Sequence, residues 1–157
     1  MEPTIILERR VAGLNQRMLA AFVAHASKEV GLAGAVTVMV TGNREMRRLN
    51  FRFRGKDQST DVLSFPPPEF VSGFAGDIAI CFDIAARNAR TLNHSTAEEV
   101  RVLVLHGILH LAGYDHEGDQ GEMAKTEDDL RKRLALPSGL IKRNTVKRRM
   151  RSSRSQT

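Results

Sequence analysis

The first half of the chain contains short stretches of β-branched and apolar residues, which are separated by longer stretches with helical spacing of apolar positions. The β-branched stretches predict strands at residues 4–7, 35–41, 62–65 and 77–82. Apolar residues that recur every three or four positions predict helices over residues 14–30, 43–53 and 83–92. Asn43 and Asp83 are expected to cap the second and third of these helices through their side chains.

Two further helices are predicted between residues 95 and 134. Ser95 and Glu98 have the spacing of a capping box, which predicts a helix from about residue 96 to 112. The middle of this helix is apolar almost all round, so we expect it to be buried at the centre of the protein. Gly113 is expected to end it in the left-handed conformation, and a last helix is expected over residues 119–134.

Strands that come early and helices that come late indicate an α+β fold. We therefore expect a small mixed β-sheet packed with helices around one buried central helix. The length of 157 residues fits a single domain, which we expect to span residues 1–137, because Pro137 follows the last helical pattern.

The positive charge of the chain is concentrated after that boundary. The chain has 24 basic and 18 acidic residues, but residues 138–157 hold seven basic residues and no acidic one. This composition predicts a disordered tail that suits a polyanion such as RNA. The candidate RNA-binding residues are Lys142, Arg143, Lys147, Arg148 and Arg149. The alternative is that the tail only keeps the protein soluble.

The sequence offers no signal for a membrane or for secretion. No run of 18 apolar residues is present, and the first residues lack the basic region that opens a signal peptide. Cys81 is the single cysteine, which favours a reducing compartment. We therefore expect a cytoplasmic protein without a membrane partner.

Three of the five histidines fall within eleven residues, at positions 106, 110 and 116. His106 and His110 lie one turn apart on the predicted central helix, so both imidazoles can reach one metal ion. The turn at Gly113 can bring His116 to the same point. Three protein ligands and one open position form the arrangement of a catalytic zinc site. His25 and His94 are interpreted as surface or partly packed histidines.

Two other classes of zinc protein fit this pattern less well. The metzincin proteases share the histidine spacing, but they carry a glutamate as general base where this chain has Gly107. An assembly factor with a structural zinc would need a fourth protein ligand, and no second cysteine is available. A non-catalytic protein that binds RNA or ribosomes remains the main alternative to an enzyme, and a metalloprotease is the weaker one.

The residues His106-Gly107-Ile108-Leu109-His110-Leu111-Ala112-Gly113-Tyr114-Asp115-His116 resemble the signature of the YbeY endoribonucleases, which are bacterial rRNA maturation factors. Two further blocks agree and follow in the same order, one over residues 50–66 and one at residues 76–78. The first half of the domain up to residue 49 and the basic tail carry no signature of the family.

The resemblance implies a zincin-like fold with one Zn²⁺ per chain, held by His106, His110 and His116. It implies cleavage of single-stranded RNA, with a role in maturation of the 16S rRNA 3′ end and in ribosome quality control. Arg54 matches the family's motif arginine, and Arg54 and His116 are the expected catalytic residues. No residue is expected to bind an organic cofactor.

The resemblance also implies rRNA, the small ribosomal subunit and the GTPase Era as partners. Two roles stay open at this point. Asp115 either orients a histidine or stabilises the turn, and Arg54 either contacts a phosphate or forms a surface ion pair.

Overall fold

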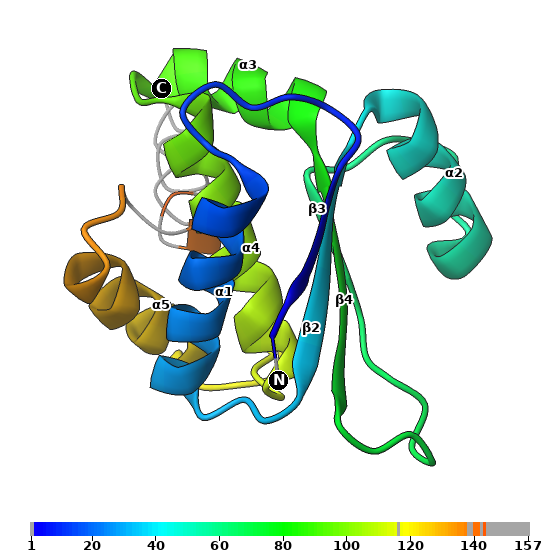
Figure 1. The fold of residues 1–157 in the computed structure, drawn as a ribbon, viewed down its shortest axis with the longest axis vertical. Coiled ribbons are helices and arrows are strands. Elements are labelled where there is room, and N and C mark those ends of the chain that lie inside the picture. Colours follow the sequence, from blue (N-terminus) through cyan, green and yellow to red (C-terminus); the bar gives the residue numbers. More distant parts are fainter. Residues whose placement is uncertain (1, 116, 138–139, 142, 144–157) are drawn as a thin grey trace, which may run out of the picture.

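A computed structural model describes residues 2–115, 117–137, 140–141 and 143 of the chain. Over these residues the elements follow in the order strand, helix, strand, helix, two strands and three helices (Figure 1). The strands are β1 (Thr4–Leu7), β2 (Ala35–Thr41), β3 (Val62–Phe65) and β4 (Phe74–Cys81). The helices are α1 (Gln16–Val30), α2 (Asn43–Arg54), α3 (Phe82–Leu92), α4 (Thr96–Leu111) and α5 (Glu122–Arg133).

The four strands form one mixed sheet in the order β1-β2-β4-β3. Strand β2 runs parallel to both β1 and β4, whereas β3 runs antiparallel to β4 at the edge. The α+β fold with a small mixed sheet is therefore confirmed. All four strands lie within two or three residues of their predicted bounds.

The two faces of the sheet are covered unequally. Helices α1, α4 and α5 lie on one side of it, and α2 lies alone on the other (Figure 1). Alternate residues of β4 divide between these layers. Ile78 and Ile80 belong to the main core with α4, whereas Ala79 and Cys81 pack with Met46 of α2.

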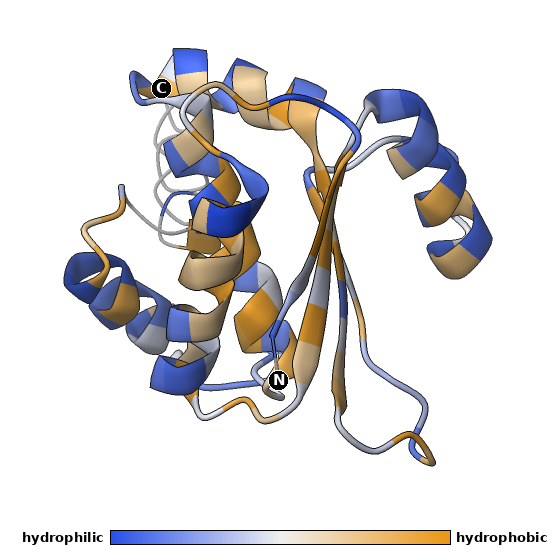
Figure 2. Cartoon of the chain, viewed as in Figure 1, coloured by the Kyte–Doolittle hydropathy of each residue, from blue (hydrophilic) through white to orange (hydrophobic). Residues whose placement is uncertain are grey.

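Helix α4 is the central helix that its apolar sequence predicts. Every residue from Val102 to Leu109 is buried, and the helix is coloured mainly as hydrophobic in Figure 2. Its first turn is the predicted capping box, in which the Ser95 hydroxyl and the Glu98 carboxylate each accept a hydrogen bond from the other residue's backbone N–H. Gly113 has a φ of 97°, so the chain leaves the helix through the left-handed region as expected.

The expectation that Asn43 caps α2 and Asp83 caps α3 is wrong. The residues before these helices are Gly42 and Cys81, and neither forms a side-chain cap. Instead, the Asp83 carboxylate in α3 accepts a hydrogen bond from the Asn43 backbone N–H at 2.9 Å. A residue of α3 therefore caps α2, because the two helices begin side by side at the ends of parallel strands β2 and β4.

The folded domain continues beyond the boundary at residue 137. Leu140 and Ile141 are helical, and both belong to the main hydrophobic core. The apolar side chains of these two residues pack in the core, which corrects the expectation of a tail for residues 140 and 141. In the part of the chain that the structure describes, no helix has the length and apolar character needed to cross a membrane.

Candidate active site

A cavity of about 390 Å³ opens beside the C-terminal half of α4. Five parts of the chain contribute to it: the end of α2, strand β3 with the residue before it, helix α4, the turn after α4, and Leu140 beyond α5. Its lining residues are Arg54, Asp61, Val62, Ser64, His106, His110, Asp115, Glu117 and Leu140. The cavity thus collects residues from two of the three sequence blocks that resemble the endoribonuclease family, 50–66 and 106–116.

The two helical histidines meet inside this cavity. The Nε2 atoms of His106 and His110 lie 3.0 Å apart, and the ring centroids are 4.7 Å apart. This juxtaposition follows from their spacing of four residues on α4. His106 is buried and His110 is partly exposed, so the pair forms a wall of the cavity with two imidazole nitrogens directed at one point.

A buried carboxylate fixes the orientation of His106. Glu127 of α5 is 1% exposed, and its Oε2 lies 2.8 Å from Nδ1 of His106. Because a carboxylate only accepts, the imidazole donates from Nδ1 and directs the lone pair of Nε2 into the cavity. The other oxygen of Glu127 accepts a hydrogen bond from the Ile141 backbone N–H at 2.8 Å.

Sequence reasoning missed Glu127, although a signal was present. Glu127 shares one face of α5 with Met123 and Leu130, and all three are buried. An acidic residue at the centre of an apolar helix face must have a partner, because an unpaired buried charge is costly. That rule could have singled out Glu127 without naming His106 as the partner.

Gly107 lets α4 pack directly on the sheet. A Cβ atom at this position would lie 3.0 Å from both Cδ1 and Cγ2 of Ile78 in β4. The position therefore faces the sheet and not the cavity, so a glutamate here could not act as the general base of a protease without moving the helix. The geometry agrees with the sequence argument against a metalloprotease.

Arg54 lies at the mouth of the same cavity. It belongs to the last turn of α2 and is exposed. Arg54 forms no ion pair with another described residue, and its exposed side chain lines the same cavity as the two histidines. Asp61 accepts a hydrogen bond from the Val62 backbone N–H, and the Ser64 hydroxyl donates to the Gly107 carbonyl at 3.4 Å. Both side chains thereby fix the wall formed by β3.

Comparison with known proteins agrees with this arrangement. The family model of endoribonuclease YbeY matches residues 4–135. The chain belongs to the endoribonuclease YbeY family. An endoribonuclease YbeY from Koribacter versatilis is 54% identical over 141 residues, which cover 90% of this chain and 91% of that protein. One from Solibacter usitatus is 42% identical over 142 residues, which cover 89% and 93% of the two chains.

A solved structure supports the fold of this YbeY-family chain. The solution structure of a Thermotoga maritima protein is 34% identical in sequence and has a TM-score of 0.57. The match covers 81% of this chain and 85% of that one. The resemblance found in the sequence motifs is thus confirmed over most of the chain, including the first half of the domain, where no signature was recognised.

The third expected ligand of this YbeY-family site, His116, lies outside the described residues. Its two neighbours in the chain, Asp115 and Glu117, both line the cavity. Asp115 accepts hydrogen bonds from the Glu117 backbone N–H, and its carbonyl accepts one from Gly118, so it stabilises the turn. Within the described ranges, which omit residue 116, no cluster of three or more candidate metal ligands is found.

Arg143 is the candidate RNA-binding residue of the tail that lies among the described residues. Its Nη1 donates to both carboxylate oxygens of Glu99 at 2.8 and 3.1 Å, and both side chains are buried. His94 and Asn88 also contact this carboxylate, at 2.9 and 3.3 Å. Arg143 is therefore a partner of a buried acid and not a free cation, because Glu99 needs a charge to offset its burial.

Four of the candidate RNA-binding residues lie outside the described residues: Lys142, Lys147, Arg148 and Arg149. His25 is exposed on α1, as interpreted from the sequence. His94 is partly buried against Glu99, which agrees with the interpretation of a packed histidine.

Proposed function

We propose that this protein is a metal-dependent endoribonuclease that cleaves single-stranded RNA. The observation that carries this proposal is the pair of Nε2 atoms of His106 and His110, 3.0 Å apart in a cavity that also contains Arg54. The names of the family relatives support the activity. Maturation of the 16S rRNA 3′ end and ribosome quality control are the proposed biological roles.

The residues of the cavity fit a zinc ion. Two nitrogen ligands at zinc distances of about 2.05 Å lie about 3.3 Å apart in a tetrahedral site, so the observed 3.0 Å needs an adjustment of a few tenths of an ångström. We propose His106, His110 and His116 as the ligands of one zinc per chain. When bound, zinc polarises a phosphoryl oxygen and activates water at neutral pH.

The residues around the histidines have separate tasks. Glu127 keeps the proton of His106 on Nδ1, which makes Nε2 the nitrogen that would bind the metal. Arg54 presents guanidinium N–H groups to the oxygens of the scissile phosphate, where negative charge builds up in the transition state. His116 is proposed as a catalytic residue because it would be the third ligand of the zinc ion.

The cavity favours an enzyme over an assembly factor with a structural zinc. A structural zinc is normally enclosed by four protein ligands, whereas these histidines line an open space of about 390 Å³. The proposed partners are single-stranded rRNA, the small ribosomal subunit and the GTPase Era. The proposed compartment is the cytoplasm, where ribosomes are assembled.

The test is to measure zinc content and cleavage of a single-stranded RNA by the purified protein and by His110→Ala. We expect one zinc per chain in the wild type, and loss of most zinc and of all cleavage in the variant. His25→Ala is the matched control, because it removes an exposed histidine from α1 and should change neither quantity. A wild-type protein that binds zinc but does not cleave RNA would favour the assembly factor.

A further inference from the structure

The positive charge of the folded domain is concentrated on α2 and the loop that follows it. Residues 43–57 hold six basic and two acidic residues, although residues 1–137 together hold 17 basic and 18 acidic ones. The rest of the domain is therefore acidic. A polyanion that approaches the domain should be attracted to this one segment.

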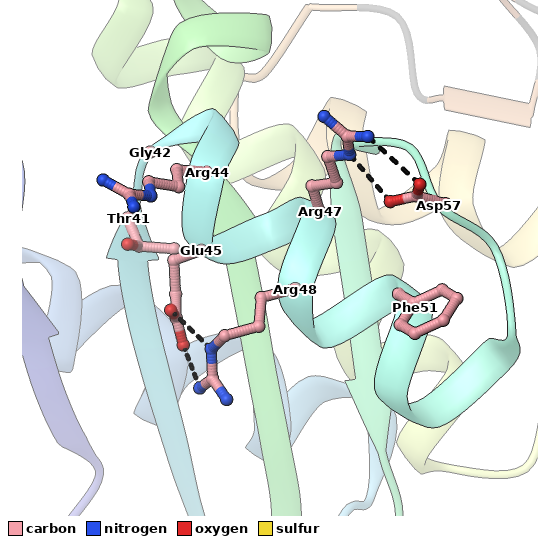
Figure 3. Close-up of a pocket in the computed structure, with 8 residues that line it drawn as sticks. All are labelled: Thr41, Gly42, Arg44, Glu45, Arg47, Arg48, Phe51 and Asp57. Atoms are coloured by element: carbon pink, nitrogen blue, oxygen red, sulfur yellow. Dashed lines mark hydrogen bonds and ion pairs between the residues drawn. The ribbon is translucent and has the colours of Figure 1, made fainter.

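The outer face of α2 carries this charge together with an aromatic ring. Arg44 lies three and four residues before Arg47 and Arg48, and Phe51 lies four and three residues after them. These four residues therefore lie on one face of the helix. Figure 3 shows them along a surface hollow of about 480 Å³. The opposite face, with Met46 and Asn50, is buried against the sheet.

The side chains on this face are accessible to a ligand. Phe51 is 59% exposed, and Arg44 forms no ion pair with another described residue. Arg47 and Arg48 pair with Asp57 and Glu45, as the dashed lines in Figure 3 mark. Exposed ion pairs of this kind contribute little free energy, so a phosphate can compete for these arginines.

This face leads directly to the candidate active site. Arg54, at the mouth of the cavity, is three residues beyond Phe51 on the same helix, or about 4.5 Å along its axis. Arg44 is ten residues from Arg54, or about 15 Å. At roughly 3.4 Å per nucleotide of a stacked strand, that distance corresponds to about four nucleotides.

We propose that the outer face of α2 binds the single-stranded RNA next to the cleavage site, with a base stacked on Phe51 and phosphates contacted by Arg44, Arg47 and Arg48. This inference rests on the proposed function and extends it to the segment of substrate outside the cavity. Arginines interleaved with an exposed aromatic ring suit a flexible strand, because the ring accepts any base and the arginines follow the backbone.

The test uses the full-length protein and fluorescent single-stranded RNAs of 4 and 14 nucleotides. We compare the wild type with the double variant Arg44→Glu/Phe51→Ala. Both positions are exposed, so the variant should melt at the wild-type temperature. Arg17→Glu on α1 is the matched control, since it makes the same charge change on an exposed helix across the sheet.

For the 14-nucleotide RNA we expect the double variant to bind at least about fivefold more weakly, and the slope of log affinity against log salt to fall by about 0.7. Arg17→Glu should bind the 14-nucleotide RNA with the wild-type affinity and salt slope. The 4-nucleotide RNA cannot fill the cavity and span the face at once, so the double variant should lose less affinity for it.

Two results overturn the proposal. If the wild type cleaves and binds the long RNA but the double variant binds it equally well with the same salt slope, the face does not contact RNA. If RNA binding is unchanged while binding to purified small ribosomal subunits is lost, the face docks a protein. A wild type that neither binds nor cleaves RNA would instead refute the proposed function itself.

Discussion

At the scale of single residues, Arg54 is the group whose position gives the sharpest expectation. It lines the cavity with the two histidines but contributes nothing to the core. Arg54→Glu should therefore leave the melting temperature and zinc content close to wild type, while cleavage falls at least tenfold, which is about 1.4 kcal/mol in the barrier.

The control for Arg54 is Arg52→Glu, two residues earlier on the same helix. Arg52 lies over the ring of Phe53, with its guanidinium carbon 5.4 Å from the ring centroid, and does not line the cavity. Equal losses of cleavage in the two variants would mean that general positive charge on α2 matters and that the position of Arg54 does not.

Glu127 gives the second expectation at this scale. Its two oxygens serve different donors, Nδ1 of His106 and the backbone N–H of Ile141. Glu127→Gln keeps only one acceptor oxygen and no charge, so we expect zinc affinity to fall about 10- to 100-fold. Competition with a chelator of known affinity measures this. The control is Glu122→Gln, which changes an exposed residue of the same helix and should bind zinc like the wild type. If Glu127→Gln also binds zinc like the wild type, the Glu127 carboxylate does not position His106.

At the scale of secondary-structure elements, the contact between α2 and α3 determines how α2 is held. The Asn43 backbone N–H donates to Asp83, and this hydrogen bond, assisted by Arg9, keeps the pKa of the Asp83 carboxyl below its usual value of 3.8. Asp83→Ala removes the carboxylate that caps α2 and should cost about 1 kcal/mol of unfolding free energy.

The pH dependence of this cost has a definite sign. Because the pKa of Asp83 is lowered on folding, its contribution is fully present above pH 3.8 and is lost as the pH falls through the lower folded pKa. The difference between wild type and Asp83→Ala in denaturant unfolding should therefore be constant from pH 5 to 7 and shrink below pH 3.8. A difference that does not change down to pH 2 would show that the anionic form is not what stabilises α2.

At the scale of the whole molecule, the segment after Pro137 joins the core to the candidate active site. Leu140 and Ile141 pack in the core, Ile141 donates to Glu127, and Arg143 pairs with the buried Glu99. Deleting residues 138–157 leaves Glu99 without its cation, so we expect a loss of at least about 3 kcal/mol of stability.

The matched truncation removes only residues 144–157. It deletes five basic residues but keeps the contacts of Leu140, Ile141 and Arg143, so its stability should stay near wild type. Any weakening of RNA binding in this shorter deletion then reports on the basic tail itself, whose role in binding RNA stays a prediction. Equal melting temperatures for the two truncations would contradict the structural role of residues 140–143.

The sequence by itself determined the parts of this protein that depend on local periodicity. The β-branched residues of β4 and the apolar surface of α4 predicted both elements. The spacing of His106 and His110 predicted their shared face, because helix geometry alone brings residues four apart together. The match to Arg54 came from a motif, which names a residue without giving its surroundings.

Only the tertiary structure decided which distant groups complete these elements. Asp83 caps a helix 40 residues away in sequence, Glu127 orients a histidine 21 residues away, and Arg143 pairs with an acid 44 residues away. Local patterns cannot give such pairs, since a buried charge shows that it needs a partner but not where that partner lies. Packing of α5, Ile141 and Arg143 beside α4 supplies the partners of His106 and Glu99, and the adjacent starts of α2 and α3 supply the partner of Asn43.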